Sequence, residues 1–178
     1  WNYLREICNR AHCIVPTKWG KGVFESHNVR VADVIYHALP DGWQNVKHPP
    51  GPYDVVYLNN VYTFLDNAMG NPVVECERKG WRWWELICSR FSCIGFAPHC
   101  NILNRFTVGY NVPNVSMVYH LLSLGKVYTS LTTHEGFGIN NIMALALGLR
   151  QVTWDIPVLR ETIGDIPGVY MVPAPIKR

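Results

Sequence analysis

The residues best suited to chemistry form a short turn, Glu135-Gly136-Phe137-Gly138, which leads into an apolar stretch typical of a helix. The start of a helix offers backbone N–H groups without an intrahelical acceptor and carries a partial positive charge, so it attracts anions. Glycine on either side of an aromatic residue lets the backbone approach a ligand closely. Glu135 can accept hydrogen bonds from ligand hydroxyl groups. The turn therefore predicts a ligand rich in negative charge and hydroxyl groups, such as a nucleotide sugar.

The elements that must position this turn follow from the hydrophobic pattern, in which strand-like and helix-like segments alternate along the chain. A strand over 126–131 leads directly to Glu135, and the next helix covers about 138–147 and ends at Gly148. Further strands are expected at 13–15, 31–38, 53–58, 93–97, 106–110, 151–154 and 169–172, and further helices at 2–11, 17–27, 80–91, 113–123 and 158–163.

This alternation predicts an α/β fold, with a Rossmann-like, doubly wound parallel sheet covered by helices on both faces. Ligands of such sheets bind beyond the carboxyl ends of the strands, which is where the strand over 126–131 delivers Glu135. The Pro- and Gly-rich stretch over 39–52 interrupts the pattern and is expected to be a linker or hinge.

Length and composition limit the function classes. A chain of 178 residues that is 48% hydrophobic and 16% charged fits one globular domain, or one and a fraction. The net charge of +3 is mild, and the absence of a dense Lys/Arg run argues against a nucleic-acid partner. No run of eighteen apolar residues and no secretory signal are visible, so a cytoplasmic location is expected.

The six cysteines include no Cys-x-x-Cys pair, which argues against a zinc or redox motif. Two interpretations stay open. Most of them are small buried hydrophobic residues, or they form one or two disulfides.

The turn and the residues after it resemble the donor-site motif of the retaining glycosyltransferases with the GT-B fold, the family that includes glycogen synthases and sucrose-phosphate synthases. The family pattern runs roughly Glu-Gly-Phe-Gly-Leu-Pro-Pro-Leu-Glu-Ala-Met-Ala-x-Gly, followed by Asp-Ile-Pro-x-Leu-Arg-Glu. The matching positions are Glu135, Gly136, Phe137, Gly138, Ala144, Ala146, Gly148, Asp155, Ile156, Pro157, Leu159, Arg160 and Glu161. Asn140 and Asn141 replace two prolines, and Met143 replaces a second glutamate.

Three earlier segments, 8–20, 34–41 and 77–81, are similar to the family in order and spacing, so the resemblance covers about residues 4–165. It implies that residues 1–40 are the tail of an N-terminal, acceptor-side Rossmann-like domain. Residues 41–52 would be a hinge, and 53–178 a C-terminal nucleotide-sugar-binding domain. Because the family's enzymes have two such domains, we expect a fragment or a donor-binding half, with the missing N-terminal domain as its partner.

The resemblance also implies roles for individual residues. Glu135 would bind hydroxyls of the donor sugar, and Lys79, with Arg78, would hold the diphosphate. Met143 cannot accept two strong hydrogen bonds as a glutamate does, so weaker nucleotide binding is expected. Further donor-binding candidates are the turn residues Gly136, Phe137 and Gly138, the neighbouring His134 and Asn140, and Val108, Gly109 and Tyr110, which lie where relatives cradle the nucleobase.

The leading hypothesis is transfer of a hexose from a nucleoside-diphosphate sugar to a hydroxyl of a carbohydrate, lipid or protein acceptor. Retention of the anomeric configuration follows only from the resemblance. No cluster has metal-ligand spacing and no Asp-x-Asp occurs, so we expect chemistry without a metal or other cofactor, with Lys and Arg at the diphosphate. Two alternatives stay open: a nucleotide-sugar-binding module without turnover, and a sugar-nucleotide epimerase on the same architecture.

Trp81, Trp83 and Trp84 are compatible with a surface for carbohydrate or for peripheral membrane association. Their helical spacing favours core packing for Trp81 and Trp84, whereas Trp83 faces elsewhere.

Overall fold

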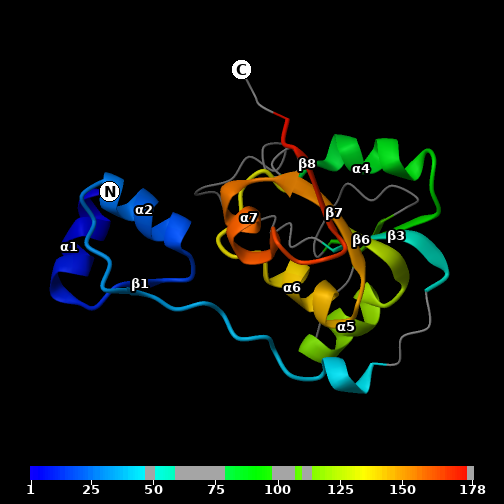
Figure 1. Ribbon diagram of the computed structural model, residues 1–178, viewed down its shortest axis with the longest axis horizontal. Helices are drawn as coiled ribbons and strands as arrows, with labels where there is room; N and C mark the ends of the chain where they lie inside the picture. The colour runs from blue at the N-terminus through cyan, green and yellow to red at the C-terminus, as the bar shows by residue number, and fades with distance from the viewer. Residues whose placement is uncertain (47–50, 59–78, 98–106, 110–113, 176–178) are drawn as a thin grey trace.

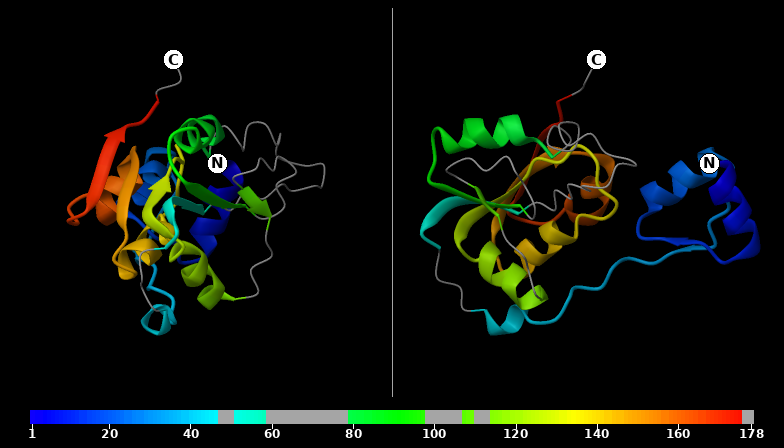
Figure 2. Two further views of the ribbon diagram at one scale, coloured as in Figure 1. Left: turned by 90° about the vertical axis from the view of Figure 1, so that its right-hand side faces the viewer. Right: turned by 180° about the vertical axis from the view of Figure 1, so that it is seen from behind.

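The computed structural model describes residues 1–46, 51–58, 79–97, 107–109 and 114–175. The first residues form a small unit of α1 (Asn2–Arg10), β1 (Ile14–Val15), α2 (Lys18–Ser26) and β2 (Asp33–Val34), in which the two strands pair in parallel. This unit lies to one side of the part that carries the large sheet (Figure 1). An extended stretch leads from β2 to the short 3-10 helix η1 (Trp43–Asn45), as the right-hand view of Figure 2 shows.

Six parallel strands form the large sheet in the order β5-β4-β3-β6-β7-β8. They are β3 (Tyr53–Leu58), β4 (Cys93–Ala97), β5 (Thr107–Gly109), β6 (Gly125–Ser130), β7 (Arg150–Asp155) and β8 (Val169–Pro173). The chain adds β4 and β5 on one side of β3 and then returns to add β6, β7 and β8 on the other side. This doubly wound order confirms the predicted fold class, and its reversal between β3 and β6 creates a crevice at their carboxyl ends.

Helices cover both faces of the sheet (Figure 1). α5 (Val115–Leu122) and α6 (Ile139–Ala146) pack on one core cluster, and α4 (Trp81–Cys88) and α7 (Pro157–Ile163) on the other. Alternate residues of β3 enter the two clusters: Val56 and Leu58 join the first, and Tyr57 joins the second. This alternation is what a strand buried on both sides requires.

The small N-terminal unit differs from its sequence pattern. The expected apolar face of α1 is mostly solvent-exposed, because Cys8 is buried but Leu4 and Ile7 are not. The strand expected over 31–38 is limited to Asp33–Val34. Its partner β1 is only two residues long, since Pro16 follows it and lacks the N–H that a ladder needs.

On the α4 face, Trp84 is fully buried and Trp81 packs against the same core, as the spacing predicts. Trp83 is 42% exposed and makes an edge contact with Trp154. The helix expected over 80–91 ends earlier, at Cys88, and Phe91 beyond it is exposed.

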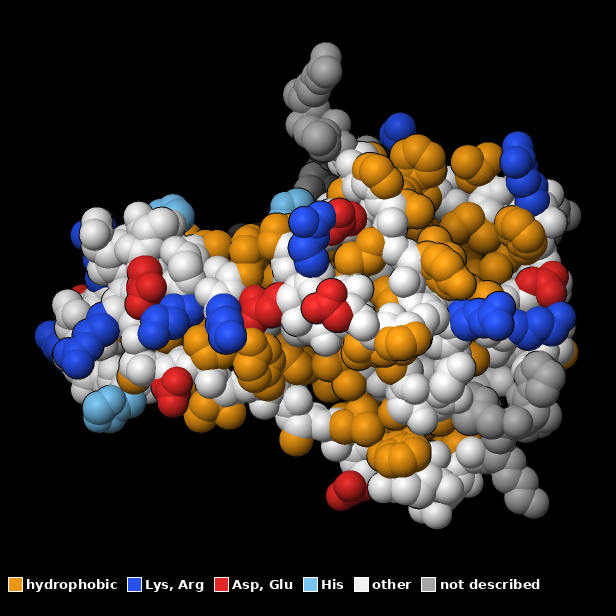
Figure 3. All heavy atoms as spheres, viewed as in Figure 1, with side chains coloured by type: hydrophobic (Ala, Val, Ile, Leu, Met, Phe, Trp, Pro, Cys, Tyr) orange, Lys and Arg blue, Asp and Glu red, His pale blue; other side chains and the backbone are white. Residues whose placement is uncertain are grey.

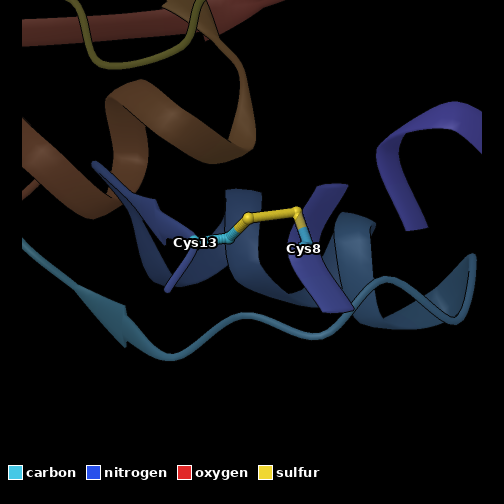
Figure 4. Close-up of a disulfide and its surroundings, with 2 residues drawn as sticks. All are labelled: Cys8 and Cys13. Atoms are coloured by element: carbon cyan, nitrogen blue, oxygen red, sulfur yellow. A yellow bond between two sulfur atoms is a disulfide. The ribbon is translucent and has the colours of Figure 1, made fainter. Parts of the chain in front are cut away.

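The structure contains both expected kinds of cysteine. Cys8 and Cys13 form a disulfide that ties the end of α1 to the residue before β1 (Figure 4). Cys88 and Cys93 are free thiols and are buried. The other two cysteines, Cys76 and Cys100, lie outside the described residues.

The thiols of Cys88 and Cys93 are expected to resist alkylation in the folded protein. Burial raises the pKa of both thiols, and only the thiolate attacks an alkylating reagent. Peptide mapping after iodoacetamide treatment at about pH 8 should show little label at either residue until denaturant is added. Rapid labelling of the native protein at these two positions would contradict their burial.

Candidate functional site

A cavity of about 470 Å³ opens at the carboxyl ends of β3 and β6, at the reversal in strand order. This is the position at which doubly wound sheets bind ligands, and the volume suits a small organic ligand. Its wall contains Tyr57, Leu58, Lys79, Tyr128, Ser130, Leu131, Thr132, His134, Glu135, Gly136, Gly138, Ile139, Asn140 and Asn141.

Lys79 and Glu135 meet in this cavity although they are 56 residues apart in sequence. The Lys79 Nζ lies 3.0 Å from the Glu135 Oε1, and the two side chains are 10% and 27% exposed. A cation and a carboxylate so placed offer one group that binds phosphate oxygens and another that binds hydroxyls. Lys79 and the turn that carries Glu135 therefore face the same cavity.

The backbone of Lys79 is held from two sides. Its carbonyl accepts a hydrogen bond from the buried Tyr57 hydroxyl. Gly80, which follows it, has φ +78° and begins α4 in close contact with Leu131. The Leu131 carbonyl in turn accepts a 2.8 Å hydrogen bond from the indole N–H of Trp154. Lys79 is thus fixed against the end of β6, which leads to Glu135.

Gly80→Ala is expected to destabilise the fold by about 3 kcal/mol or more, because it adds an overlap to an unfavourable backbone angle. A Cβ at Gly80 would lie 2.4 Å from the Leu131 carbonyl oxygen. Gly148→Ala is the matched control, since Gly148 has φ +73° but nothing within 4 Å of its added Cβ. That control should cost only about 1 kcal/mol. Equal losses in chemical denaturation would contradict the close contact.

The turn that carries Glu135 is held by local bonds and by packing. The Thr132 hydroxyl donates to the His134 carbonyl at 2.9 Å. Gly138 has φ +83°, a conformation that favours glycine, and an added Cβ would lie 2.5 Å from Leu159 Cδ2 of α7. One turn further, the Asn141 side-chain amide donates to the Gln151 Oε1 at 3.0 Å, which fastens α6 to β7.

The other predicted site residues fall into three groups. His134, Gly136, Gly138 and Asn140 lie in the cavity wall with Glu135 and Lys79. The Phe137 ring is 6% exposed and packs against the rings of Tyr36 and His37. Val108 and Gly109 belong to β5, which β4 separates from β3, and the structure does not describe their side chains. Arg78 and Tyr110 lie outside the described residues.

Sequence reasoning missed Tyr57 and Tyr128, which lie near the carboxyl ends of β3 and β6 and contribute to the cavity wall. A phenol is unusual in a strand buried on both faces, because its hydroxyl needs a partner. The Tyr57 hydroxyl donates to the Lys79 carbonyl and that of Tyr128 to the Leu58 carbonyl. A tyrosine near the end of each apolar run was the signal available.

No group of three His, Cys, Asp or Glu side chains among the described residues could hold a metal ion. Over the same residues, none of the helices combines the length and the apolar character that crossing a membrane requires.

No protein-family model and no curated protein matches the chain. Solved structures do. TarM superposes on 97% of the chain with a TM-score of 0.66 at 16% identity. The pneumococcal O-GlcNAc transferase GtfA, in complex with UDP and GlcNAc, covers 91% with a TM-score of 0.57 at 16% identity. Sucrose-phosphate synthase from Thermosynechococcus elongatus covers 90% with a TM-score of 0.59 at 12% identity.

The fold is that of the GT-B glycosyltransferases. At these identities the likeness concerns the fold, and the residues of the cavity must support any statement about activity. The chain spans 36% of TarM, 34% of GtfA and 45% of the sucrose-phosphate synthase. The chain is therefore similar in fold to less than half of each of these proteins.

Proposed function

We propose that this chain binds the donor of a glycosyltransferase. The full-length protein would transfer a hexose from a nucleoside-diphosphate sugar to an acceptor hydroxyl, with retention and without a metal. The contact between Lys79 and Glu135 in the cavity at the strand reversal carries the proposal. The similar fold of GtfA, which was solved with UDP and GlcNAc, supports a nucleotide sugar and makes UDP the first nucleotide to test.

Lys79 would stabilise the negative charge on the departing nucleoside diphosphate. Breaking the glycosidic bond leaves a nucleoside diphosphate whose bridging oxygen gains negative charge. A fixed ammonium group in a site with little water stabilises such charge, often as the largest catalytic contribution. The side chain of Lys79 is largely buried, so its charge is poorly screened by solvent.

Glu135 would bind the hydroxyl groups of the sugar. Its carboxylate accepts hydrogen bonds from hydroxyl groups and is held at the entrance to α6 by the Gly136–Gly138 turn. This carboxylate also keeps the Lys79 ammonium oriented. A diphosphate would compete for that ammonium and free Glu135 for the sugar hydroxyls.

Met143 favours a second candidate, a nucleotide-sugar-binding module without turnover. Its side chain is only 3% exposed and belongs to the core beside α5. It therefore leaves no acceptor where the family pattern has its second glutamate, a loss that would weaken the hold on the nucleotide by about 1.5–3 kcal/mol. Asn140, in the cavity wall, is the candidate to compensate for part of this loss.

We also keep the proposal that residues 1–40 are the tail of a second domain, 41–52 a hinge and 53–178 the donor-binding domain. The N-terminal unit supports it with exposed apolar side chains, several of which are visible on the left of Figure 3. They are Trp1, Tyr3, Leu4, Ile7, Ile14, Trp19, Ile35 and Tyr36. The rest of an acceptor-side domain in a longer protein would cover such a surface.

Calorimetric titration of the full-length protein with UDP, GDP, ADP and their sugars tests the proposal. Binding of one nucleotide sugar, followed by transfer to an acceptor with retained anomeric configuration, is the expected result. Binding without transfer or donor hydrolysis would select the non-catalytic module. No binding of any of these ligands at millimolar concentration to a folded protein would refute both.

A further inference from the structure

Glu161 makes contacts that its place in the sequence does not suggest. It lies in α7, and its Oε1 accepts hydrogen bonds from the Lys18 backbone N–H and the Tyr36 hydroxyl, each at 2.7 Å. Its Oε2 accepts the Trp19 backbone N–H at 2.9 Å. These partners are 125 to 143 residues away, so one carboxylate fastens the N-terminal unit to the part that holds the cavity.

The geometry at the start of α2 explains why a carboxylate is used. The first N–H groups of a helix have no intrahelical acceptor and carry a partial positive charge. Glu161 accepts two of them, while the Thr17 hydroxyl accepts the N–H of Gly20 at 3.0 Å. Burial tends to raise the pKa of Glu161, but these hydrogen bonds outweigh it, so its pKa is lowered and the group is ionised at neutral pH.

The segment that contains Tyr36 and His37 reaches the turn that carries Glu135. The Tyr36 ring lies 6.1 Å from the Phe137 ring at an interplanar angle of 51°. The His37 ring meets Phe137 edge-on at 4.9 Å and 81°. Phe137 sits between Gly136 and Gly138, two residues after Glu135, and is only 6% exposed.

α7 also touches the turn directly. Leu159, two residues before Glu161, packs so closely on Gly138 that an added Cβ would overlap it. The turn is therefore supported by α7 from one direction and by Tyr36 and His37 from another. Glu161 links these supports, because it holds Tyr36 to α7.

We propose that Glu161 is a positioning residue whose carboxylate holds Tyr36 and His37 on Phe137, and thereby keeps Glu135 beside Lys79. Lys79 has separate supports in Gly80, Tyr57 and Leu131. Loss of the Glu161 carboxylate therefore affects recognition of the sugar more than recognition of the diphosphate. The effect on ligands depends on the proposed function, whereas the effect on the turn does not.

The test compares Glu161→Ala, Glu161→Gln and the control Asp165→Asn in the full-length protein. Asp165 is an exposed carboxylate just beyond α7, so its variant loses the same charge without touching α2. Glu161→Ala should lower the affinity for the nucleotide sugar by about tenfold. Its affinity for the free nucleoside diphosphate should stay within about twofold of the wild-type value. Glu161→Gln, which keeps an acceptor oxygen, should lose less, and Asp165→Asn should match the wild type. Equal losses for both ligands would mean general destabilisation and would overturn the proposal.

A double-mutant cycle with Phe137→Leu tests the route. If Glu161 acts through Phe137, the double variant should lose little more affinity for the nucleotide sugar than the worse single variant. Additive losses would show that the two residues act separately and would overturn the proposal.

Hydrogen exchange measures the turn without any ligand, so it separates this proposal from the proposed function. Glu161→Ala should speed amide exchange in peptides that cover 17–26 and also in those that cover 134–140. Faster exchange at 17–26 alone would show that Glu161 only anchors α2, and it would refute the positioning role. If Glu161→Ala speeds exchange in both segments but the wild-type protein binds no nucleotide, the proposed function is refuted and the link between Glu161 and the turn is retained.

Discussion

Lys79→Ala is expected to weaken binding of the nucleoside diphosphate by about ten- to hundredfold, the usual value of a charge-assisted hydrogen bond to a buried group. The ligand is whichever of UDP, GDP or ADP the wild type binds. Lys79 is the lysine among the described residues of the cavity wall. Its side chain is only 10% exposed, so water can do little to replace its contact with the diphosphate. The loss should be seen in calorimetric titration at fixed ionic strength, because screening by salt changes such contacts.

Lys126→Ala is the matched control. Lys126 is also a lysine paired with a carboxylate, since its Nζ lies 2.8 Å from the Asp54 Oδ1, but both groups are exposed. It lies near the start of β6, at the opposite end of the sheet from the cavity. Its removal should leave affinity unchanged. A folded Lys79→Ala protein with wild-type affinity for the nucleotide would remove Lys79 from the site.

Glu135→Gln should lower the affinity for the nucleotide sugar but not the affinity for the free nucleoside diphosphate. The variant loses a charged acceptor for sugar hydroxyls, so affinity for the nucleotide sugar should fall by about ten- to hundredfold. It also removes the carboxylate that holds the Lys79 ammonium at 3.0 Å. The free nucleoside diphosphate no longer competes with that carboxylate and should bind as well as before or more tightly.

Titrating both ligands into wild type, Glu135→Gln and Glu85→Gln tests this prediction. Glu85 is an exposed carboxylate on α4, the helix that begins directly after Lys79 and Gly80. The Glu85→Gln protein should behave as the wild type. A parallel loss of both ligands in Glu135→Gln would show that Glu135 supports the cavity without contacting the sugar.

The fold of the sheet could be predicted well because each buried strand is a short apolar run between strong breakers. The expected strands at 53–58 and 93–97 match β3 and β4 in their bounds. The N-terminal unit was harder, because β2 can extend only as far as its partner β1, whose length Pro16 limits. The exposed face of α1 was also unpredictable, since amphipathic spacing states which side chains share a face but not what covers them.

The site was also predictable in part, because glycines mark its turns. Gly80 directly follows Lys79 and Gly138 lies three residues after Glu135; both glycines have a positive φ, and such glycines mark turns that bring the backbone near a ligand. Glu161 was known only as a member of a motif. Two of its three partners are backbone N–H groups, which any residue except proline supplies. The residue types at 17–19 therefore could not predict the contact.

Gly80 and Gly138 begin α4 and α6 in the left-handed conformation, and neither helix start has a side-chain cap. Engineers who seek a sturdier protein usually exchange such a residue for serine, threonine or aspartate, the common capping types. Here an added side chain at either residue would collide with Leu131 or Leu159. Thermal robustness must therefore be sought at remote positions such as Gly22, where an added methyl group meets open space.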